Sequence, residues 1–128
     1  MNQKVIESLE KWVKGEKSEP EKVQIYPTNK CNLNCIFCAQ RNENYGYNTE
    51  LSKEEWIKVS KEIAEMNVNR ILISGGGEPF SRPETTLKIM KIAKRNEIKG
   101  RLITNGTLLN EKILNTLIEI KWDDVVFS

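Results

Sequence analysis

Three cysteines on one short stretch are the residues of this sequence best suited to do chemistry. Cys31, Cys35 and Cys38 are the only cysteines of the 128-residue chain, with the spacing C-x3-C-x2-C. Thiolates are the ligands of iron–sulfur clusters, zinc and cuprous copper. Three of them on one loop can converge on a single centre, and the spacing suits an iron–sulfur cluster better than a disulfide pair. A [4Fe-4S] cluster held by three cysteines has one iron without a protein ligand, where we expect the chemistry.

The chain contains no histidine, which narrows the chemistry further. Its absence excludes Cys-His zinc sites, Ser-His-Asp triads and imidazole as an acid, a base or a ligand. A structural zinc ion takes four ligands, and the fourth would have to be a carboxylate or come from a second chain. A zinc-stabilised interaction domain therefore stays as one alternative, and an iron–sulfur binding or electron-transfer module without radical chemistry is another.

Composition indicates one soluble globular domain of modest size. The chain is 38% hydrophobic and 30% charged, with a net charge of +2 from 20 basic and 18 acidic residues. We find no dense basic run that would track nucleic-acid phosphates and no apolar segment long enough to span a membrane. An odd number of clustered cysteines without an export signal predicts a reducing, cytoplasmic location.

The cysteine loop must be positioned by the elements on either side of it. Residues 1–20 read as a separate leading helix, broken by Gly15 and Pro20, whose apolar face we expect to cover one end of the domain at residues 21–128; docking to a partner is the alternative. That face comprises Val5, Ile6, Leu9, Trp12 and Val13. The alternating segment 22–26 predicts a first strand that ends at Pro27 and leads directly into the cysteine loop.

Three helices and three further strands follow. Ser52 and Glu55 form an S-x-x-E capping box that starts a helix, a second helix runs from about Glu84 to Asn96, and Asn110 caps a third. Strands are expected at 70–74, at Leu102 and Ile103, and at 124–128. The expected inward-facing side chains are Trp56, Val59, Ile63 and Met66, then Thr86, Ile89, Met90 and Ala93, then Ile113, Leu114, Leu117 and Ile118.

The resulting order, a leading helix and then β-α-β-α-β-α-β, predicts an α/β fold with a parallel sheet. Ligands bind outside the carboxyl ends of parallel strands. Four features follow these ends and should gather on one face: the cysteines, Gly75 to Pro79 (GGGEP), Thr104-Asn105-Gly106 (TNG), and Ser128. The polar loop 39–50, in which Tyr45 and Tyr47 flank a glycine, favours a surface turn over a lid.

From Val23 to Ser128 the sequence resembles the radical S-adenosylmethionine (radical SAM) enzymes. The resemblance rests on C-x3-C-x2-C after a first strand with Phe37 before the third cysteine, GGGEP after the second strand, TNG after the third and a fourth strand that ends in serine. It implies a partial (β/α) TIM-type barrel, of which this chain would form about the first half. The later strands, and an extension carrying auxiliary clusters, would lie on a missing carboxyl-terminal half or a partner chain.

The resemblance also implies roles for individual residues. The three cysteines would ligate three irons of a [4Fe-4S] cluster, and the fourth iron would take the amino and carboxylate groups of S-adenosylmethionine. Phe37 sits where the family contacts adenine, Ser128 where it reaches the ribose or carboxylate, and Asn105 faces the same site. The segment along the methionine part of the ligand would be Gly75, Gly76, Gly77, Glu78 and Pro79, with Glu78 able to pair with the ammonium group.

The implied enzyme is an oxidoreductase that cleaves S-adenosylmethionine reductively. A flavodoxin or ferredoxin would supply one electron, and the resulting 5′-deoxyadenosyl radical would abstract hydrogen from an unknown peptide or small-molecule substrate. The bare apolar edge at 124–128 would invite pairing with another chain. We therefore expect the 128-residue chain to bind a cluster without turning over substrate.

Overall fold

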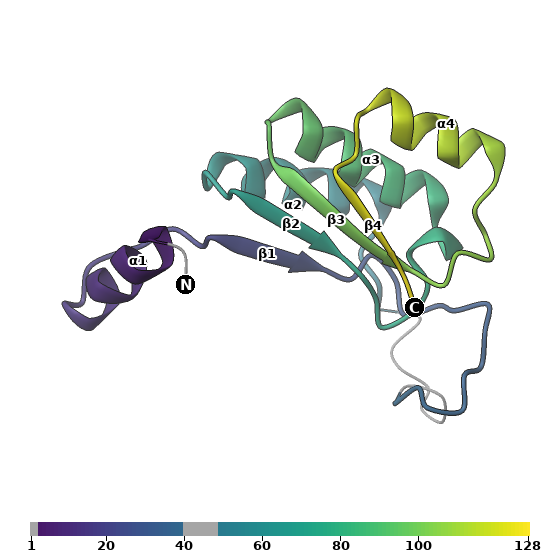
Figure 1. The fold of residues 1–128 in the computed structure, drawn as a ribbon, viewed down its shortest axis with the longest axis horizontal. Coiled ribbons are helices and arrows are strands. Elements are labelled where there is room, and N and C mark those ends of the chain that lie inside the picture. Colours follow the sequence, from purple (N-terminus) through teal and green to yellow (C-terminus); the bar gives the residue numbers. More distant parts are fainter. Residues whose placement is uncertain (1–2, 40–48) are drawn as a thin grey trace.

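A computed structural model describes residues 3–39 and 49–128, so the turn predicted at Tyr45 and Tyr47 lies outside the described residues. Four parallel strands alternate with helices in the predicted order (Figure 1). The elements are α1 (Gln3–Val13), β1 (Lys22–Ile25), α2 (Lys53–Glu65), β2 (Arg70–Ile73), a 3-10 turn η1 (Pro79–Ser81), α3 (Pro83–Arg95), β3 (Lys99–Thr104), α4 (Glu111–Glu119) and β4 (Asp124–Phe127).

The strands lie side by side in the order β1-β2-β3-β4, each pair parallel and in continuous register. Since the order never reverses, α2, α3 and α4 all lie on one face of the sheet, as in a singly wound barrel (Figure 1). All four strands point the same way, so their carboxyl ends share one edge. The predicted α/β fold with a parallel sheet is confirmed.

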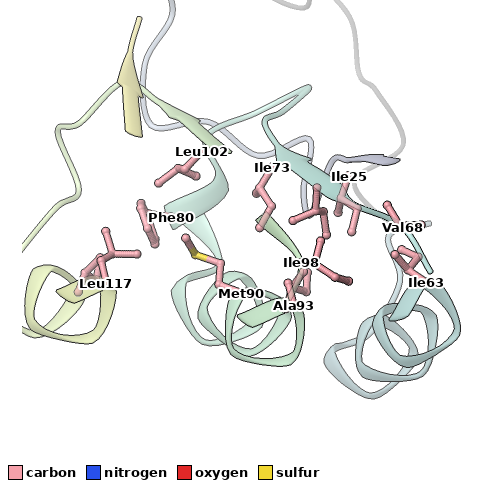
Figure 2. Close-up of a cluster of buried hydrophobic side chains, with 13 residues drawn as sticks. Ile25, Ile63, Val68, Ile73, Phe80, Met90, Ala93, Ile98, Leu102 and Leu117 are labelled. Atoms are coloured by element: carbon pink, nitrogen blue, oxygen red, sulfur yellow. The ribbon is translucent and has the colours of Figure 1, made fainter. Parts of the chain in front are cut away.

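The core fills the space between the sheet and these three helices (Figure 2). Every second residue of the central strands points into it: Ile71 and Ile73 from β2 and Leu102 from β3 are at most 2% exposed. The helices contribute Ile63, Ile89, Met90, Ala93, Ile113 and Leu117. This packing fixes the strands rigidly, and with them the loops at their carboxyl ends.

The helices begin where the sequence places them. Ser52 caps α2 with both hydrogen bonds of a capping box, because its hydroxyl accepts from the backbone of Glu55 while the Glu55 carboxylate accepts from the backbone N–H of Ser52. Pro83 occupies the first turn of α3. The side chain of Asn110 caps α4 by accepting from the N–H of Ile113 at 3.0 Å.

Three expected core residues are exposed instead. Met66 is 44% exposed because α2 ends at Glu65, so the helical period no longer sets its direction. Leu114 and Ile118 are 45% and 74% exposed. Helix α4 lies at the β4 margin of the layer, and only its Ile113 and Leu117 side is covered by the core (Figure 1).

The leading helix also departs from expectation. No residue of α1 is buried, and Trp12 and Val13 on its apolar face are 63% and 88% exposed. In Figure 1 the helix extends beyond the amino end of β1. Lys4 donates from Nζ to Asn69 Oδ1 at 3.4 Å, so this link to the body of the domain is polar. The expected burial of its apolar face against one end of the domain is not observed, and docking to a partner stays a prediction.

We expect Ser52→Ala to lower the free energy of unfolding by about 1 kcal/mol, because it leaves a backbone donor of α2 without its cap. Urea denaturation measures this change. Ser18→Ala, outside every helix and strand, serves as the control and should leave the unfolding free energy within about 0.5 kcal/mol of the parent value. Equal effects of the two substitutions would contradict the structure at this helix start.

The capping box should also depend on pH. Hydrogen bonds from the backbone and hydroxyl of Ser52 lower the pKa of Glu55. The stabilisation is therefore complete above the pKa of Glu55 in the unfolded chain and is lost as the pH falls through its lowered pKa in the folded chain. The destabilisation caused by Ser52→Ala should be larger at neutral pH than in acid, and a cost that grows in acid would contradict this.

Candidate functional site

The loops at the carboxyl edge of the sheet are joined through backbone hydrogen bonds. The segment that precedes the first cysteine runs beside GGGEP: the N–H of Gly77 donates to Thr28 O at 3.0 Å, and the N–H of Glu78 donates to Lys30 O at 2.9 Å. Lys30 is the neighbour of Cys31. The cysteine loop therefore begins directly beside the glycine segment.

Two glycines are required for this close approach. A Cβ atom on Gly77 would lie 2.1 Å from Lys30 O, and one on Gly75 would lie 1.8 Å from the oxygen of Gly77. Both distances are far below van der Waals contact, so no other residue fits without moving the backbone. GGGEP is thus packed tightly against the base of the cysteine loop, as we expected from its place after β2.

Glu78 is buried and its carboxylate joins two strand ends. Oε1 accepts from the hydroxyl of Thr104 at 2.6 Å and from the N–H of Phe80 at 3.1 Å, and Oε2 accepts from the N–H of Asn105 at 2.8 Å. The side chain is therefore bonded to the end of β3 and caps η1. Its pairing with an ammonium group stays a prediction, while its contacts within the protein tie GGGEP to the TNG turn.

Asn105 connects the TNG turn to the cysteine loop. Its Nδ2 donates to Asn32 Oδ1 at 3.0 Å, and Asn32 Nδ2 in turn donates to the hydroxyl of Thr107 at 2.8 Å. Asn32 follows Cys31 directly. The start of the cysteine loop, GGGEP and TNG are thus in contact, and the fourth predicted feature, Ser128, bonds to Thr104 of TNG through its N–H.

The three cysteines carry free thiols, with Cys31 and Cys38 exposed and Cys35 half-buried. The N–H of Cys38 donates to Cys35 O at 3.1 Å, which forms a turn between them, and the N–H of Leu33 donates to the sulfur of Cys31 at 3.5 Å. Within residues 3–39 and 49–128, no three Cys, Asp or Glu side chains are arranged as a ready metal site. Convergence of the three sulfurs stays a prediction.

Phe37 and Ser128 lie at the margins of this edge. Phe37 is 85% exposed. Ser128 continues the ladder between β3 and β4, because its N–H donates to Thr104 O at 3.1 Å. Their contacts with adenine, ribose or carboxylate stay predictions.

The sequence predicted no role for three side chains that hold these loops in place. Thr104 carries the hydroxyl that donates to Glu78, and Glu50 and Arg82 bond to both flanks of the cysteine loop. Glu50 and Arg82 each read as ordinary surface charges in the sequence. The local signal for Thr104 was its place directly before Asn105, at a strand end already expected to face the site.

The family model of the radical SAM superfamily matches residues 25–128 of this chain. This chain belongs to the radical SAM superfamily. The matched region holds all three cysteines, GGGEP, TNG, strands β2 to β4, and Ile25 at the end of β1.

Curated relatives and solved structures agree with this membership. The chain is 33% identical over 101 residues to a PqqA peptide cyclase of Gluconobacter oxydans, which covers 79% of this chain and 28% of the relative. It is 35% identical over 101 residues to a probable GTP 3′,8-cyclase of Methanococcus maripaludis, covering 79% and 33%. The fold matches Streptococcus suis SuiB bound to S-adenosylmethionine with a TM-score of 0.74 at 24% identity, covering 98% of this chain and 29% of SuiB.

A second structural match is BtrN in complex with AdoMet and 2-DOIA, with a TM-score of 0.73 at 18% identity over 87% of this chain and 46% of BtrN. These matches confirm the expected partial barrel fold of the radical SAM type. The chain spans about a third or less of the length of the curated relatives named above. In residues 3–39 and 49–128, no helix has the length and apolar character needed to cross a bilayer.

The residues at this edge fit the cluster and ligand that the family implies. The donor set is three free thiols on one loop in a chain without histidine, which suits iron–sulfur chemistry and lacks the four-ligand set of structural zinc. The neighbouring glycine segment packs against the base of the cysteine loop, where a Cβ atom on Gly77 would collide with Lys30 O. The hydrogen bonds of Gly77 and Glu78 to Thr28 and Lys30 set this backbone next to Cys31, where the ligand implied by the family would bind.

We expect Glu78→Gln to lower the free energy of unfolding by about 1–3 kcal/mol without any ligand. The carboxylate accepts hydrogen bonds on both oxygens, and in glutamine one of these oxygens is replaced by an NH2 group that cannot accept. Chemical denaturation of the apoprotein measures this change. Glu62→Gln, on an exposed position of α2, should have almost no effect. If both variants were as stable as the parent, Glu78 would have no structural role.

Proposed function

We propose that this chain is the amino-terminal part of a radical SAM catalytic domain. Cys31, Cys35 and Cys38 would ligate three irons of a [4Fe-4S] cluster, and Gly75 to Pro79 would seat the methionine part of S-adenosylmethionine at the fourth iron. The observation that carries the proposal is the backbone pairing of Gly77 and Glu78 with Thr28 and Lys30. This pairing supports a ligand seat beside the first cysteine.

When bound, the reduced cluster would supply one electron to the sulfonium of S-adenosylmethionine, whose C5′–S bond would break to give methionine and a hydrogen-abstracting 5′-deoxyadenosyl radical. The chain's own residues would orient the ligand and shield it. Gly75 and Gly77 would let the ligand seat pack directly against the base of the cysteine loop. Asn105, held by Asn32, would offer a polar group on the TNG side, with Phe37 at adenine and Ser128 at the ribose or carboxylate.

The proposed substrate is a peptide or a small molecule. Relatives that match at nearly equal identity include a peptide cyclase and a probable GTP cyclase, which supports both classes. The proposed electron donor is a flavodoxin or a ferredoxin. We place the protein in the cytoplasm because its clustered free thiols need a reducing environment.

The organisation we propose has α1, with residues 1–20, as a segment separate from the partial barrel at 21–128. The absence of buried residues in α1 supports this division. Further strands and helices, from a longer chain or a partner, would complete the barrel beside β4. The exposed apolar residues Leu114, Ile118 and Phe127 at that margin support such a partner surface.

Anaerobic reconstitution tests the proposal directly. We expect about four iron and four sulfide ions per chain, and a change in the electron paramagnetic resonance spectrum of the reduced cluster when S-adenosylmethionine is added. A cluster whose spectrum does not change when S-adenosylmethionine is added would indicate an electron-transfer module instead. Purified protein with one zinc ion and no sulfide would indicate a zinc-stabilised interaction domain.

Single serine substitutions at Cys31, Cys35 and Cys38 should each abolish the stable [4Fe-4S] cluster, because each removes one of three thiolate ligands. Iron and sulfide analysis and visible absorbance measure the loss. Asn34→Ser, in the same loop at a position without a thiol, should retain the parent cluster content. Full cluster content in any of the three cysteine variants would overturn the ligand assignment.

A further inference from the structure

An ion pair lies at the base of the cysteine loop. It includes neither a cysteine nor a residue of GGGEP. Arg82 Nη1 lies 3.5 Å from Glu50 Oε2, and the two side chains are only 22% and 12% exposed. Glu50 follows the loop in sequence, and Arg82 lies between η1 and α3. We call residues 27–30, before the first cysteine, the near flank of the loop, and residues 50–51 its far flank. The ion pair thus joins the far flank to the helical layer.

Glu50 also bonds to the near flank of the loop. Its Oε1 accepts from the backbone N–H of Asn29 at 2.6 Å and from the hydroxyl of Thr28 at 2.8 Å. The same hydroxyl of Thr28 accepts from the N–H of Lys30 at 3.0 Å. The Glu50 carboxylate therefore fixes the backbone just before Cys31, on the segment that pairs with GGGEP.

Arg82 bonds to both the near and the far flank of the loop. Its Nη1 donates to Pro27 O at 3.2 Å on the near flank and to Leu51 O at 2.8 Å on the far flank. The backbone of Arg82 is itself held, because its N–H donates to Pro79 O and its carbonyl accepts from the N–H of Thr86. The guanidinium is therefore a fixed point to which both flanks of the loop are bonded.

A second ion pair nearby shows that this arrangement is more than ordinary surface charge. Lys53 Nζ lies 2.9 Å from Glu84 Oε2, which is shorter, but the side chains are 40% and 81% exposed and link only α2 to α3. Exposed pairs of this kind contribute little. The Glu50–Arg82 pair is shielded from water and shares its atoms with three backbone groups of the loop flanks.

We propose that Glu50 and Arg82 are positioning residues for the cluster. By joining the segments 27–30 and 50–51 they hold the base of the cysteine loop closed and keep Cys31 beside Gly77. The three cysteines then lie on a loop whose ends are already fixed, which lowers the entropy cost of bringing the sulfurs together. This inference rests on the proposed cluster site and assigns roles to two residues outside it.

The test compares cluster retention in variants of the full 128-residue chain after anaerobic reconstitution. Glu50→Gln keeps an oxygen for Asn29 and Thr28 but turns an amide donor toward Arg82, and Arg82→Met removes every donor of the guanidinium. We expect both to lose the cluster to an added chelator about 10-fold or more faster than the parent, followed by visible absorbance. Arg82→Lys, which keeps the charge without the planar fork, should rescue only part of the retention.

Two controls separate positioning from general destabilisation. Glu84→Gln breaks the exposed ion pair, and Asn110→Ala removes the cap of α4, away from the loop. Both should lose the cluster at the parent rate. If Glu50→Gln and Arg82→Met lost it no faster than Asn110→Ala, the positioning role would be overturned.

Hydrogen exchange of the apoprotein gives a second readout that needs no cluster. The N–H of Asn29 should exchange faster in Glu50→Ala than in the parent, since it loses its acceptor, while amides of β2 should be unchanged. Unchanged exchange at Asn29 would contradict the inference. A parent protein that binds no cluster at all would instead overturn the proposed function, so the two failures can be distinguished.

Discussion

The site depends on the contact between two pieces of backbone, residues 28–30 and residues 77–78. Two hydrogen bonds join them, and the absence of a side chain on Gly77 lets them approach. One piece is continuous with the first cysteine and the other is the glycine segment. Because each follows one of two paired parallel strands, β1 or β2, whose inner residues pack into the core, the strand pairing determines their separation. The first proposed metal ligand and the proposed ligand seat would thus be held together by main-chain geometry.

Two shielded carboxylates reinforce this contact from opposite sides. Glu78 bonds the glycine segment to the end of β3. Glu50, which follows the cysteine loop, bonds directly to Asn29 before the loop and also pairs with Arg82. Each carboxylate accepts from at least two donors of the protein, which repays part of the cost of removing its charge from water. Anions beside a proposed site of three thiolates are tolerable here because their hydrogen bonds are already made within the protein.

Much of the scaffold could be predicted from the sequence, since its signals are local. The S-x-x-E box fixed the start of α2, the apolar run at 70–74 indicated a buried strand, and GGGEP was placed by the strand before it. The hydrogen bonds that Glu50 and Glu78 make within the protein could not be predicted, because their partners lie far along the chain. The prediction from helical period that Ile118 is buried was also wrong. The period shows which residues share one face of a helix, but not how much of that face the neighbouring elements cover.

Electron nuclear double resonance on the reconstituted, reduced protein tests most directly whether the cysteines and the glycine segment form one site. The measurement uses S-adenosylmethionine labelled with ¹⁵N at its amino group. A ligand seated by Gly75 to Pro79 beside Cys31 should give a through-bond hyperfine coupling between the label and the cluster. An intact cluster with no such coupling, at ligand concentrations that saturate binding, would contradict the shared site.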